Sequence, residues 1–323
     1  MKIKAIRVHE TGGPEVLRYE EIDLPEPAAG EVRVRNRAIG LNFVETYFRS
    51  GLYPAKLPAI LGSEAAGVVE AVGQGVTNLK PGDRVAYNSA GAYAEATNVP
   101  AARALPLPAG VGDEEAAALL LKGATAEYLL FRTFRVEKGQ TILWHAAAGG
   151  VGLIATQWAK HIGATVIGTV GSDEKAAIAR AHGCDHVINY RKENVAARVL
   201  EITGGRKVPV VYDGVGKDTF LASLDCLAPR GLLVSFGNAS GPVTGVDLGI
   251  LAAKGSLYVT RPTLATYAAS PEDYAAIGAH VFDVVAKGAV RVEVKQRYQL
   301  ADAAEAHRDL EARKTTGATV LVP

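Results

Sequence analysis

From about residue 120 onward, short apolar runs alternate with helical stretches, and this alternation limits the fold more than any other feature of the chain. Apolar runs of this length are typical of buried parallel strands. The helical stretch "VGLIATQWAKHIG" follows the first run, and Gly163 is expected to end it. The six runs are "TILWHA", "ATVIGTV", "HVINY", "VPVVYD", "LLVSFG" and "SLYVT". We therefore expect an α/β fold with a doubly wound, six-stranded parallel sheet.

The first 120 residues follow a different pattern, in which short segments alternate apolar and polar residues between turns rich in Gly and Pro. A period of two with such turns predicts an antiparallel, barrel-like β domain. In "EVRVRNR" we expect Val32 and Val34 to face inward. The arginines between and after them, Arg33, Arg35 and Arg37, are expected to point to water.

The tail after about residue 261 contains a long helical segment, a strand-like "AVRVEV", a second helix "LADAAEAHRDLEAR" and a last strand "ATVLV". It is too small for a core of its own, so we expect it to pack on the N-terminal β domain. A chain of 323 residues exceeds what one core usually serves. We predict one domain from residues 1–120 completed by 261–323, and a second from residues 121–260.

The stretch "HAAAGGVG", residues 145–152, lies between a predicted strand and a predicted helix, where a glycine pattern is most informative. Ala147, Gly149 and Gly152 occupy the three positions of a dinucleotide-binding turn, although Ala147 replaces the usual first glycine. With Gly150 and Val151, the turn would present a helix N-terminus to phosphates. The alternative is an ordinary glycine-rich loop.

The second predicted strand ends in "GTVGS", without the carboxylate that NAD-preferring turns commonly carry there. Gly171 and Ser172 leave room and donors for a 2′-phosphate, and Lys175 follows on the next helical turn. NADP is therefore the predicted cofactor. Asp173 and Glu174 could oppose this, but at a helix start they complement the dipole. Lys175 could equally be an ordinary solvated residue.

Composition indicates a soluble protein with small-molecule partners. Lys plus Arg number 35 and Asp plus Glu 34, a balance that does not favour nucleic acid or an anionic membrane. The chain shows neither a secretory signal nor a membrane-length apolar segment, so we expect a cytoplasmic location. Two cysteines, Cys184 and Cys226, are too few for a disulfide framework. In "HGCDH", residues 182–186, we expect a turn rather than a metal site.

Taken together, several motifs in order resemble the zinc-free medium-chain dehydrogenases/reductases, and most closely the bacterial NADPH:quinone oxidoreductases and zeta-crystallin. The resemblance runs nearly end to end. It implies a GroES-like β-rich catalytic domain formed by both chain ends, with a Rossmann NADP-binding domain between them. The motifs are "GGPEVL", "AIGLNFVETYFRSGLYP", "LGSEAAGVVEAVGQGV", "GDRVAY", "HAAAGGVG", "GTVGS", "HVINY", "VYDGVG" and "SFGN".

The same resemblance implies positions for the cofactor. The adenosine 2′-phosphate is expected at Gly171, Lys175, Tyr190 and Arg313. The nicotinamide half is expected in the cleft between the domains, near Asn42, Tyr47, Thr125, Phe236, Gly237 and Asn238. Relatives also commonly form dimers through their Rossmann sheets, and "GSLYVTR" is the edge strand expected to join them here.

Zinc-dependent members of the superfamily have a histidine ligand where this chain has Ser63, and no cysteine lies near Asn42 or Leu121. A catalytic zinc site is therefore not expected. A quinone is already electrophilic, so a positioned hydrogen-bond donor can suffice for hydride transfer. Tyr47 and Asn42, with Tyr53 as a weaker third, are the candidates to contact the acceptor or the nicotinamide.

Several assignments stay open at the level of sequence. Tyr47 could instead be an ordinary packing residue between domains. His145 fits a buried packing residue better than a proton carrier. Lys122 could face the cleft or cap a helix.

The predicted function is NADPH-dependent quinone reduction without a metal. One alternative is an NADPH-dependent 2-alkenal or enone reductase, which differs only in its acceptor. Another is a non-catalytic, NADPH-stabilised protein, crystallin-like or RNA-binding, for which the balanced charge gives no support.

Overall fold

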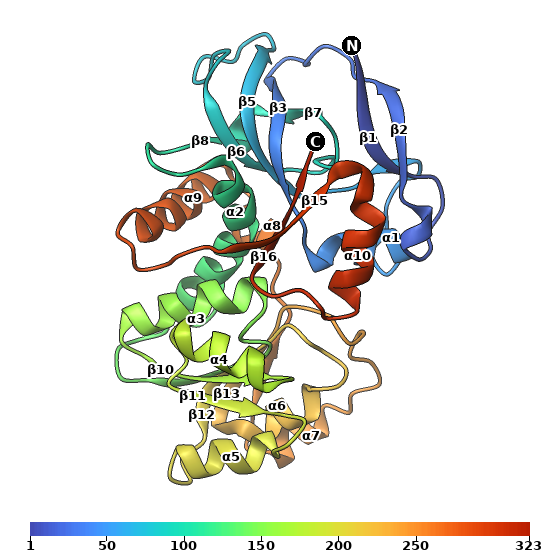
Figure 1. The fold of residues 1–323 in the computed structure, drawn as a ribbon. Coiled ribbons are helices and arrows are strands. Elements are labelled where there is room, and N and C mark those ends of the chain that lie inside the picture. Colours follow the sequence, from blue (N-terminus) through green and yellow to red (C-terminus); the bar gives the residue numbers. More distant parts are fainter. The chain divides into compact units, whose positions relative to one another are not determined.

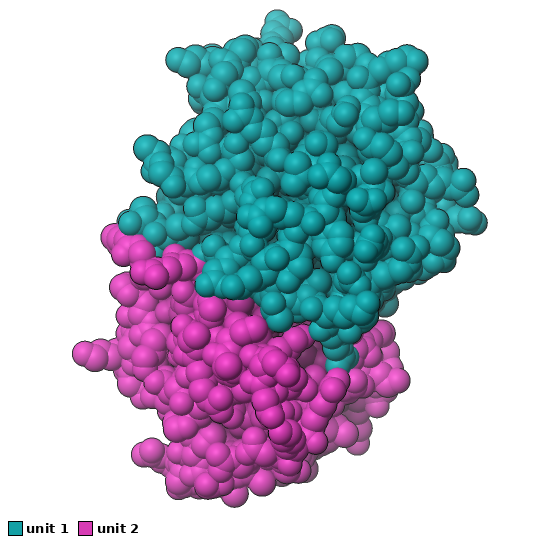
Figure 2. Space-filling view, viewed as in Figure 1, with its two compact units in different colours: residues 1–122, 270–286, 292–323 teal, residues 123–269, 287–291 magenta.

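A computed structural model describes all residues 1–323, and chain contacts divide them into two units (Figure 2). Unit 1 comprises residues 1–122, 270–286 and 292–323, so both chain ends belong to it (Figure 1). Unit 2 comprises residues 123–269 and 287–291. The division falls at 122/123 and 269/270, where the sequence predicts 120/121 and 260/261.

Unit 1 is built on two β-sheets whose paired strands are antiparallel, apart from the parallel pair β15 and β16. The larger sheet has the order β15-β16-β3-β5-β6-β8, with β7 also paired to β3, and the smaller has the order β2-β1-β4. The strands are β1 Lys2–Val8, β2 Arg18–Asp23, β3 Glu31–Gly40, β4 Ala59–Ile60, β5 Glu64–Val72, β6 Arg84–Asn88, β7 Ala96–Pro100, β8 Ala104–Pro106, β15 Val294–Gln299 and β16 Ala318–Val322.

Unit 1 contains three complete helices and the first part of a fourth. They are α1 Phe43–Ser50, α9 Pro271–Ala286 and α10 Ala303–Glu311, and α2 Asp113–Tyr128 begins in this unit and ends in unit 2. Single 3-10 turns are η1 Pro14–Val16, η2 Ala101–Arg103 and η4 Leu300–Asp302.

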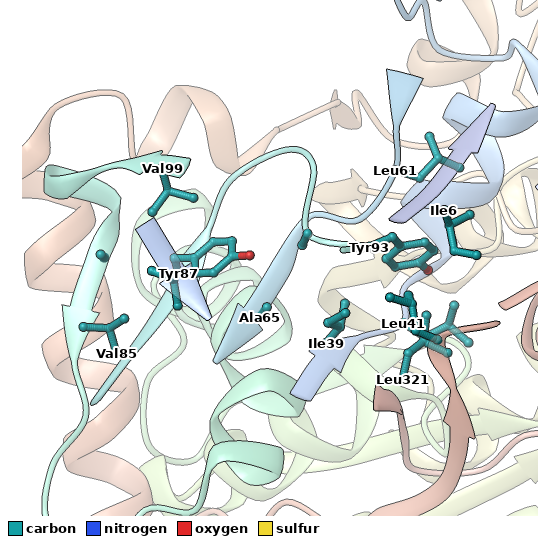
Figure 3. Packing of buried hydrophobic residues seen from close by; sticks show 14 of the residues in the cluster. Ile6, Ile39, Leu41, Leu61, Ala65, Val85, Tyr87, Tyr93, Val99 and Leu321 are labelled. Carbon is teal, nitrogen blue, oxygen red and sulfur yellow. The ribbon is translucent and has the colours of Figure 1, made fainter. Parts of the chain in front are cut away.

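The core of unit 1 gathers apolar side chains from both ends of the chain (Figure 3). Ile6 of β1, Ile39 of β3 and Leu321 of β16 are all buried in one cluster, together with Tyr87 and Tyr93. The C-terminal strand thus supplies apolar surface to a core that the N-terminal strands begin. Burial of each such side chain stabilises the fold by about 1.5–3 kcal/mol.

The prediction for Arg33 is wrong: its side chain does not point to water and is only 6% exposed. Its guanidinium donates to the Pro25 carbonyl at 2.6 Å and to the Asn98 side chain at 3.3 Å. Those residues cover this part of β3, and they satisfy the arginine there. Arg35 and Arg37 do reach the surface, paired with Glu70 and Asp113 respectively.

Unit 2 contains the predicted six-stranded parallel sheet, with the order β11-β10-β9-β12-β13-β14. This order reverses direction between β9 and β12, and ligands of such sheets bind outside the carboxyl ends of the strands at that point. The strands are β9 Thr141–Trp144, β10 Thr165–Val170, β11 His186–Asn189, β12 Val208–Asp213, β13 Leu227–Ser235 and β14 Tyr258–Thr260.

Helices connect these strands, and α3 shows how the sequence builds them. Its apolar residues Leu153, Ile154 and Trp158 recur on one buried face, and Gly163 ends it in a left-handed conformation with φ 93°. The helices are α3 Gly150–Ile162, α4 Asp173–Ala181, α5 Val195–Ile202, α6 Phe220–Cys226, α7 Gly249–Ala253 and α8 Leu264–Tyr267, with a π-helical turn, η3, at Leu129–Thr133. No helix of the protein combines the length and apolar character that crossing a membrane requires.

One strand of the tail is displaced from its predicted place. The run "AVRVEV", residues 289–294, is not a strand, and β15 instead begins at Val294. The side chain of Gln157 donates to the Arg291 carbonyl and accepts from the Arg291 N–H, both at 3.0 Å. The side chain of Gln157, on α3, thus occupies the backbone N–H and carbonyl of Arg291, which a neighbouring strand would otherwise have bonded.

Candidate cofactor and acceptor site

The turn between β9 and α3 has the shape of a phosphate cradle. Its first intrahelical bond runs from Leu153 N–H to the Gly149 carbonyl at 2.9 Å, so the N–H groups of Gly150, Val151 and Gly152 precede the helical ladder. A Cβ on Gly152 would lie 2.5 Å from the Ala146 carbonyl oxygen, closer than real atoms approach. Only glycine therefore fits there, and the helix N-terminus stays open to an anion.

Ala147 departs from the usual glycine, and the neighbouring strand accommodates its methyl group. Ala147 is fully buried, and a Cβ on Gly168 of β10 would lie 2.7 Å from the Cβ of Ala147. The same added atom would lie 2.6 Å from Cys184 Sγ. Gly168 thus provides the space that alanine at the first position needs.

At the carboxyl end of β10, the residues predicted to hold the 2′-phosphate in unit 2 lie close together. Ser172 caps α4 by accepting the Lys175 N–H at 3.3 Å. A Cβ on Gly171 would lie 2.5 Å from the Tyr190 hydroxyl, so Gly171 and Tyr190 are neighbours. Arg313 belongs to unit 1, where it follows α10 in a left-handed conformation with φ 59°. Non-glycine residues seldom adopt that conformation without a structural or functional reason.

Asp173, the carboxylate that could oppose a phosphate here, has its own partners. Lys192 Nζ and Asn189 Nδ2 donate to it at 2.5 and 2.9 Å. The bond from Lys192, followed by the bond from Asn189 and the charge of Lys192, holds the pKa of this carboxyl below its ordinary value. The Lys192 ammonium is the counter-charge of Asp173.

The predicted nicotinamide residues of unit 2 lie on the loop after β13. Gly237 packs against the backbone of Gly214, where a Cβ would come within 2.3 Å of the carbonyl oxygen, and the Phe236 ring lies 5.5 Å from the ring of Trp144. Arg261 donates to the carbonyls of Ser235 and Gly237 at 2.9 and 3.1 Å. Arg261 was missed from sequence, since a lone arginine after a strand gives no signal. Asn238 follows on this loop, and Thr125 lies on α2 within unit 2.

In unit 1, the predicted acceptor residues are grouped around α1. Asn42 immediately precedes the helix, and Tyr47 lies within it. The rings of Tyr47 and Tyr53 make an edge contact at 5.2 Å, and Tyr53 N–H donates to the Tyr47 carbonyl at 3.0 Å. The structure thus brings the two predicted tyrosines together.

A buried ion pair fixes the side chain of Asn42. Glu64 Oε1 accepts from Asn42 Nδ2 at 2.9 Å and from Lys122 Nζ at 2.8 Å, and its Oε2 accepts the Leu121 N–H at 2.7 Å. Glu64 is fully buried and Lys122 is 5% exposed, so neither ion is shielded by bulk water. Lys122 therefore serves as the counter-ion of Glu64.

Glu45 is a second buried carboxyl of this cluster, and it was missed from sequence. Its Oε2 accepts the Asn42 N–H at 2.7 Å, whereas its Oε1 has no hydrogen-bond partner. Burial raises the pKa of this carboxyl to about 7. The neighbouring Ser63 and Lys122 lower the pKa, and the charge of Glu64 raises it, but burial is the largest of these effects. The spacing of Asn42 and Glu45 is that of a helix capping box, which is the local signal that could have identified it.

The residues of the chain do not fit a metal site. No group of three or more His, Cys, Asp or Glu side chains is arranged to hold an ion. In the "HGCDH" turn, His182 Nδ1 contacts the Ile178 carbonyl at 2.8 Å, Cys184 is buried and His186 is exposed. His145 is buried between the hydroxyls of Thr169 and Ser223, and burial lowers its pKa.

Comparison with known proteins agrees with this architecture. A family described as "Alcohol dehydrogenase GroES-like domain" matches residues 28–138, and one described as "Zinc-binding dehydrogenase" matches residues 150–282. A quinone oxidoreductase of Pseudomonas aeruginosa is 60% identical over 323 residues, and the match covers 99% of each chain. A 2-haloacrylate reductase of a Burkholderia species is 44% identical, again over 99% of each chain.

A solved structure is equally similar. The quinone oxidoreductase of Escherichia coli, in complex with NADPH, matches with a TM-score of 0.98 at 52% identity, over 99% of this chain and 100% of that one. A GroES-like unit with a parallel dinucleotide-binding sheet defines the class of medium-chain dehydrogenases/reductases. Within that class, the chain belongs to the quinone oxidoreductase family. The predicted family and fold class are confirmed.

Proposed function

We propose that the protein is an NADPH-dependent quinone reductase. The observation that carries this is the carboxyl end of β10, where Gly171, Ser172, Lys175 and Tyr190 lie close together and the Asp173 carboxylate is already paired with Lys192. The Lys175 ammonium and the Tyr190 hydroxyl are the donors that a 2′-phosphate would meet there. The similar proteins are named quinone oxidoreductases, and the one from E. coli was solved with NADPH.

In this proposal the residues of unit 2 bind the cofactor. The turn of Ala147, Gly149, Gly150, Val151 and Gly152 takes the pyrophosphate at the N-terminus of α3, since unpaired N–H groups and the helix dipole both favour an anion. Lys175, Ser172 and Tyr190 take the 2′-phosphate. Arg313 is a further phosphate ligand that the family resemblance implies. Thr125, Phe236, Gly237 and Asn238 are assigned to the nicotinamide half.

The residues around α1 act on the acceptor by position rather than by acid catalysis. NADPH, when bound, supplies the hydride. Asn42 is oriented by Glu64, and a neutral Tyr47 hydroxyl can donate a hydrogen bond to a developing oxyanion without losing its proton. Tyr53 supports the ring of Tyr47. The donor set offers no metal site, so we derive no step through zinc.

The test follows the near-ultraviolet absorbance of NADPH and of NADH against 1,4-benzoquinone and a conjugated enone in parallel. Rapid loss of NADPH absorbance with the quinone, and slow loss of NADH absorbance, is the expected result. Equal rates with both cofactors would overturn the NADPH assignment. Tight NADPH binding without turnover of either acceptor would favour the non-catalytic alternative.

A second acceptor class is supported by one observation. The Burkholderia relative at 44% identity is named a 2-haloacrylate reductase, whose printed substrate is a conjugated acid. Turnover of the enone alone would move the protein to this class of conjugated carbonyl reductases.

We further propose a homodimer joined through the sheets of unit 2. Strand β14 is the edge of that sheet, and its Tyr258 and Val259 are 60% and 40% exposed. An edge strand presents unpaired backbone groups, and an apolar one is suited to pairing with a second copy. Light scattering tests this, and a monomer at micromolar concentration would contradict it. The cytoplasmic location stays a prediction.

A further inference from the structure

Four buried side chains of unit 2 and the half-buried Thr219 form one continuous hydrogen-bonded chain, which we call the Asp213 network. Thr169 Oγ1 and His145 Nδ1 lie 2.9 Å apart, His145 Nε2 and Ser223 Oγ 3.0 Å, and Ser223 Oγ and Asp213 Oδ2 2.8 Å. Thr219 Oγ1 lies 2.8 and 2.7 Å from the two carboxyl oxygens of Asp213. The chain joins the carboxyl ends of β10, β9 and β12 with helix α6.

The direction of every bond in the network follows from the acceptor at its end. Asp213 receives the N–H groups of Val215 and Gly216 at 2.8 and 3.0 Å as well as two hydroxyls, so its carboxylate acts only as an acceptor. Ser223 therefore donates to Asp213 and must accept from His145 Nε2–H. Burial lowers the pKa of His145, against an increase from the charge of Asp213, and so favours the neutral ring. In the neutral ring with a proton on Nε2, Nδ1 has no proton and accepts the Thr169 hydroxyl.

Each end of the network lies next to a turn that the cofactor proposal uses. His145 comes two residues before Ala147, whose N–H donates to the Thr169 carbonyl at 3.0 Å. Thr169 itself comes two residues before Gly171. The network thus holds the pyrophosphate turn and the 2′-phosphate turn to one another through both side chain and backbone.

At the other end of the network, Asp213 holds the loop after β13, which is the third segment assigned to the cofactor. Asp213 fixes the backbone of Val215 and Gly216. That segment in turn binds the loop after β13: Phe236 N–H donates to the Asp213 carbonyl and Ser240 N–H to the Val215 carbonyl, both at 2.8 Å. Gly237 has no room for a side chain against Gly214. A shift of Asp213 would therefore move the loop assigned to the nicotinamide.

We propose that His145, Ser223 and Asp213 are positioning residues for NADPH, which set three separate cofactor turns through one hydrogen-bonded chain. This inference rests on the proposed cofactor site. None of the three residues is more than 2% exposed, so they act through the turns and not by touching solvent. A buried donor or acceptor that loses its partner still bears the free-energy cost of removal from water. Breaking one hydrogen bond of the network therefore also disturbs the neighbouring bonds.

The test is the dissociation constant for NADPH, measured by calorimetry on the full-length protein, for Ser223→Ala and for Thr169→Val. Each single variant should weaken NADPH binding about tenfold. Because both changes break the same chain, the double variant should bind NADPH little worse than either single one.

Thr203→Val is the matched control. Its hydroxyl is also buried in unit 2, where it donates to the Val199 carbonyl at 2.7 Å and accepts the Lys207 N–H at 2.9 Å, away from the network. This variant should lower the melting temperature like Ser223→Ala and leave NADPH binding unchanged. If it weakens NADPH equally, the effect is general destabilisation and the inference is wrong.

The outcomes also separate this inference from the proposed function. A parent protein that binds NADPH no better than NADH would overturn the proposed cofactor site. A parent that prefers NADPH, with Ser223→Ala and Thr169→Val binding it equally well, would overturn the Asp213 network alone.

Discussion

Replacing Glu45 by glutamine should change the way in which the stability of this protein depends on pH. The carboxyl is fully buried, and burial raises its pKa to about 7 from the ordinary 4.5. Between these values the folded state keeps the proton that the unfolded state has lost, so stability falls as pH rises. A glutamine side chain has nearly the shape of the protonated acid and cannot ionise. The Glu45→Gln variant should escape this loss.

The size of this change in stability follows from the shift in the pKa of Glu45. Each pKa unit corresponds to about 1.4 kcal/mol, so ionisation of Glu45 costs the parent protein about 3 kcal/mol of stability between about pH 4 and pH 8. The difference in unfolding free energy between Glu45→Gln and the parent should therefore rise by about 3 kcal/mol over that range. Urea unfolding at successive pH values measures it.

A second buried group makes the comparison sharper. His307 is fully buried between Arg49 and Tyr93, and burial, with the charge of Arg49, lowers its pKa to about 3 from 6.5. It stays neutral when folded, so its contribution is lost as pH falls below 6.5. Ionisation of Glu45 lowers the unfolding free energy as pH rises, whereas the neutral His307 raises it. Where the two pH ranges overlap, the unfolding free energy of the parent should therefore change little with pH. Glu45→Gln should uncover the His307 slope of about 1.4 kcal/mol per pH unit.

Glu114→Gln is the control for this experiment, because it removes a carboxylate from an exposed pair with Arg297 in the same unit. If the difference between Glu45→Gln and the parent stays constant from about pH 4 to pH 8, the pKa of Glu45 is the same in the folded and the unfolded state. Burial would then not govern the charge of this cluster, and the inference of a protonated Glu45 would be refuted.

Three further predictions concern the cofactor and the acceptor. Lys175→Ala combined with Arg313→Ala should raise the Michaelis constant for NADPH about tenfold or more and leave that for NADH nearly unchanged, because only NADPH loses a phosphate partner; equal losses would contradict the assignment. Gly152→Ala should weaken NADPH in calorimetry at least about tenfold, since its Cβ meets the Ala146 carbonyl oxygen at 2.5 Å. Tyr47→Phe should keep at least about a tenth of the parental turnover, and near-complete inactivation in a rate assay would show that the phenol gives up its proton.

Patterns that repeat along the chain made the sheet of unit 2 predictable. All six parallel strands overlap the predicted apolar runs. The central strands are buried on both faces and must therefore be continuously apolar. The start of α3, predicted at Val151, lies one residue earlier at Gly150, and its predicted end at Gly163 is confirmed. These signals are local, and they need no knowledge of which segments meet.

The buried charges could not be predicted in the same way. Glu64 is paired with Lys122 across 58 positions of sequence, and Arg33 is bonded to Asn98 across 65. Neither pairing produces a periodic pattern in the sequence. A charged residue in a strand looks the same in the sequence whether its side chain faces water or a partner far along the chain. The prediction that Arg33 faces water is wrong for that reason. Glu45 differs, because its capping spacing to Asn42 was visible and its burial was not.

The packing of Ala147 against Gly168 and Cys184 has a consequence for how this sequence can change. The three residues share one volume, so a larger side chain at one position requires a smaller one at another. Gly168→Ala alone should be rejected by selection, whereas a relative with glycine at 147 and a smaller residue at 184 could carry alanine at 168. The side chain that the first position of the phosphate turn can carry therefore depends on two residues outside the turn, Gly168 on β10 and Cys184 after α4.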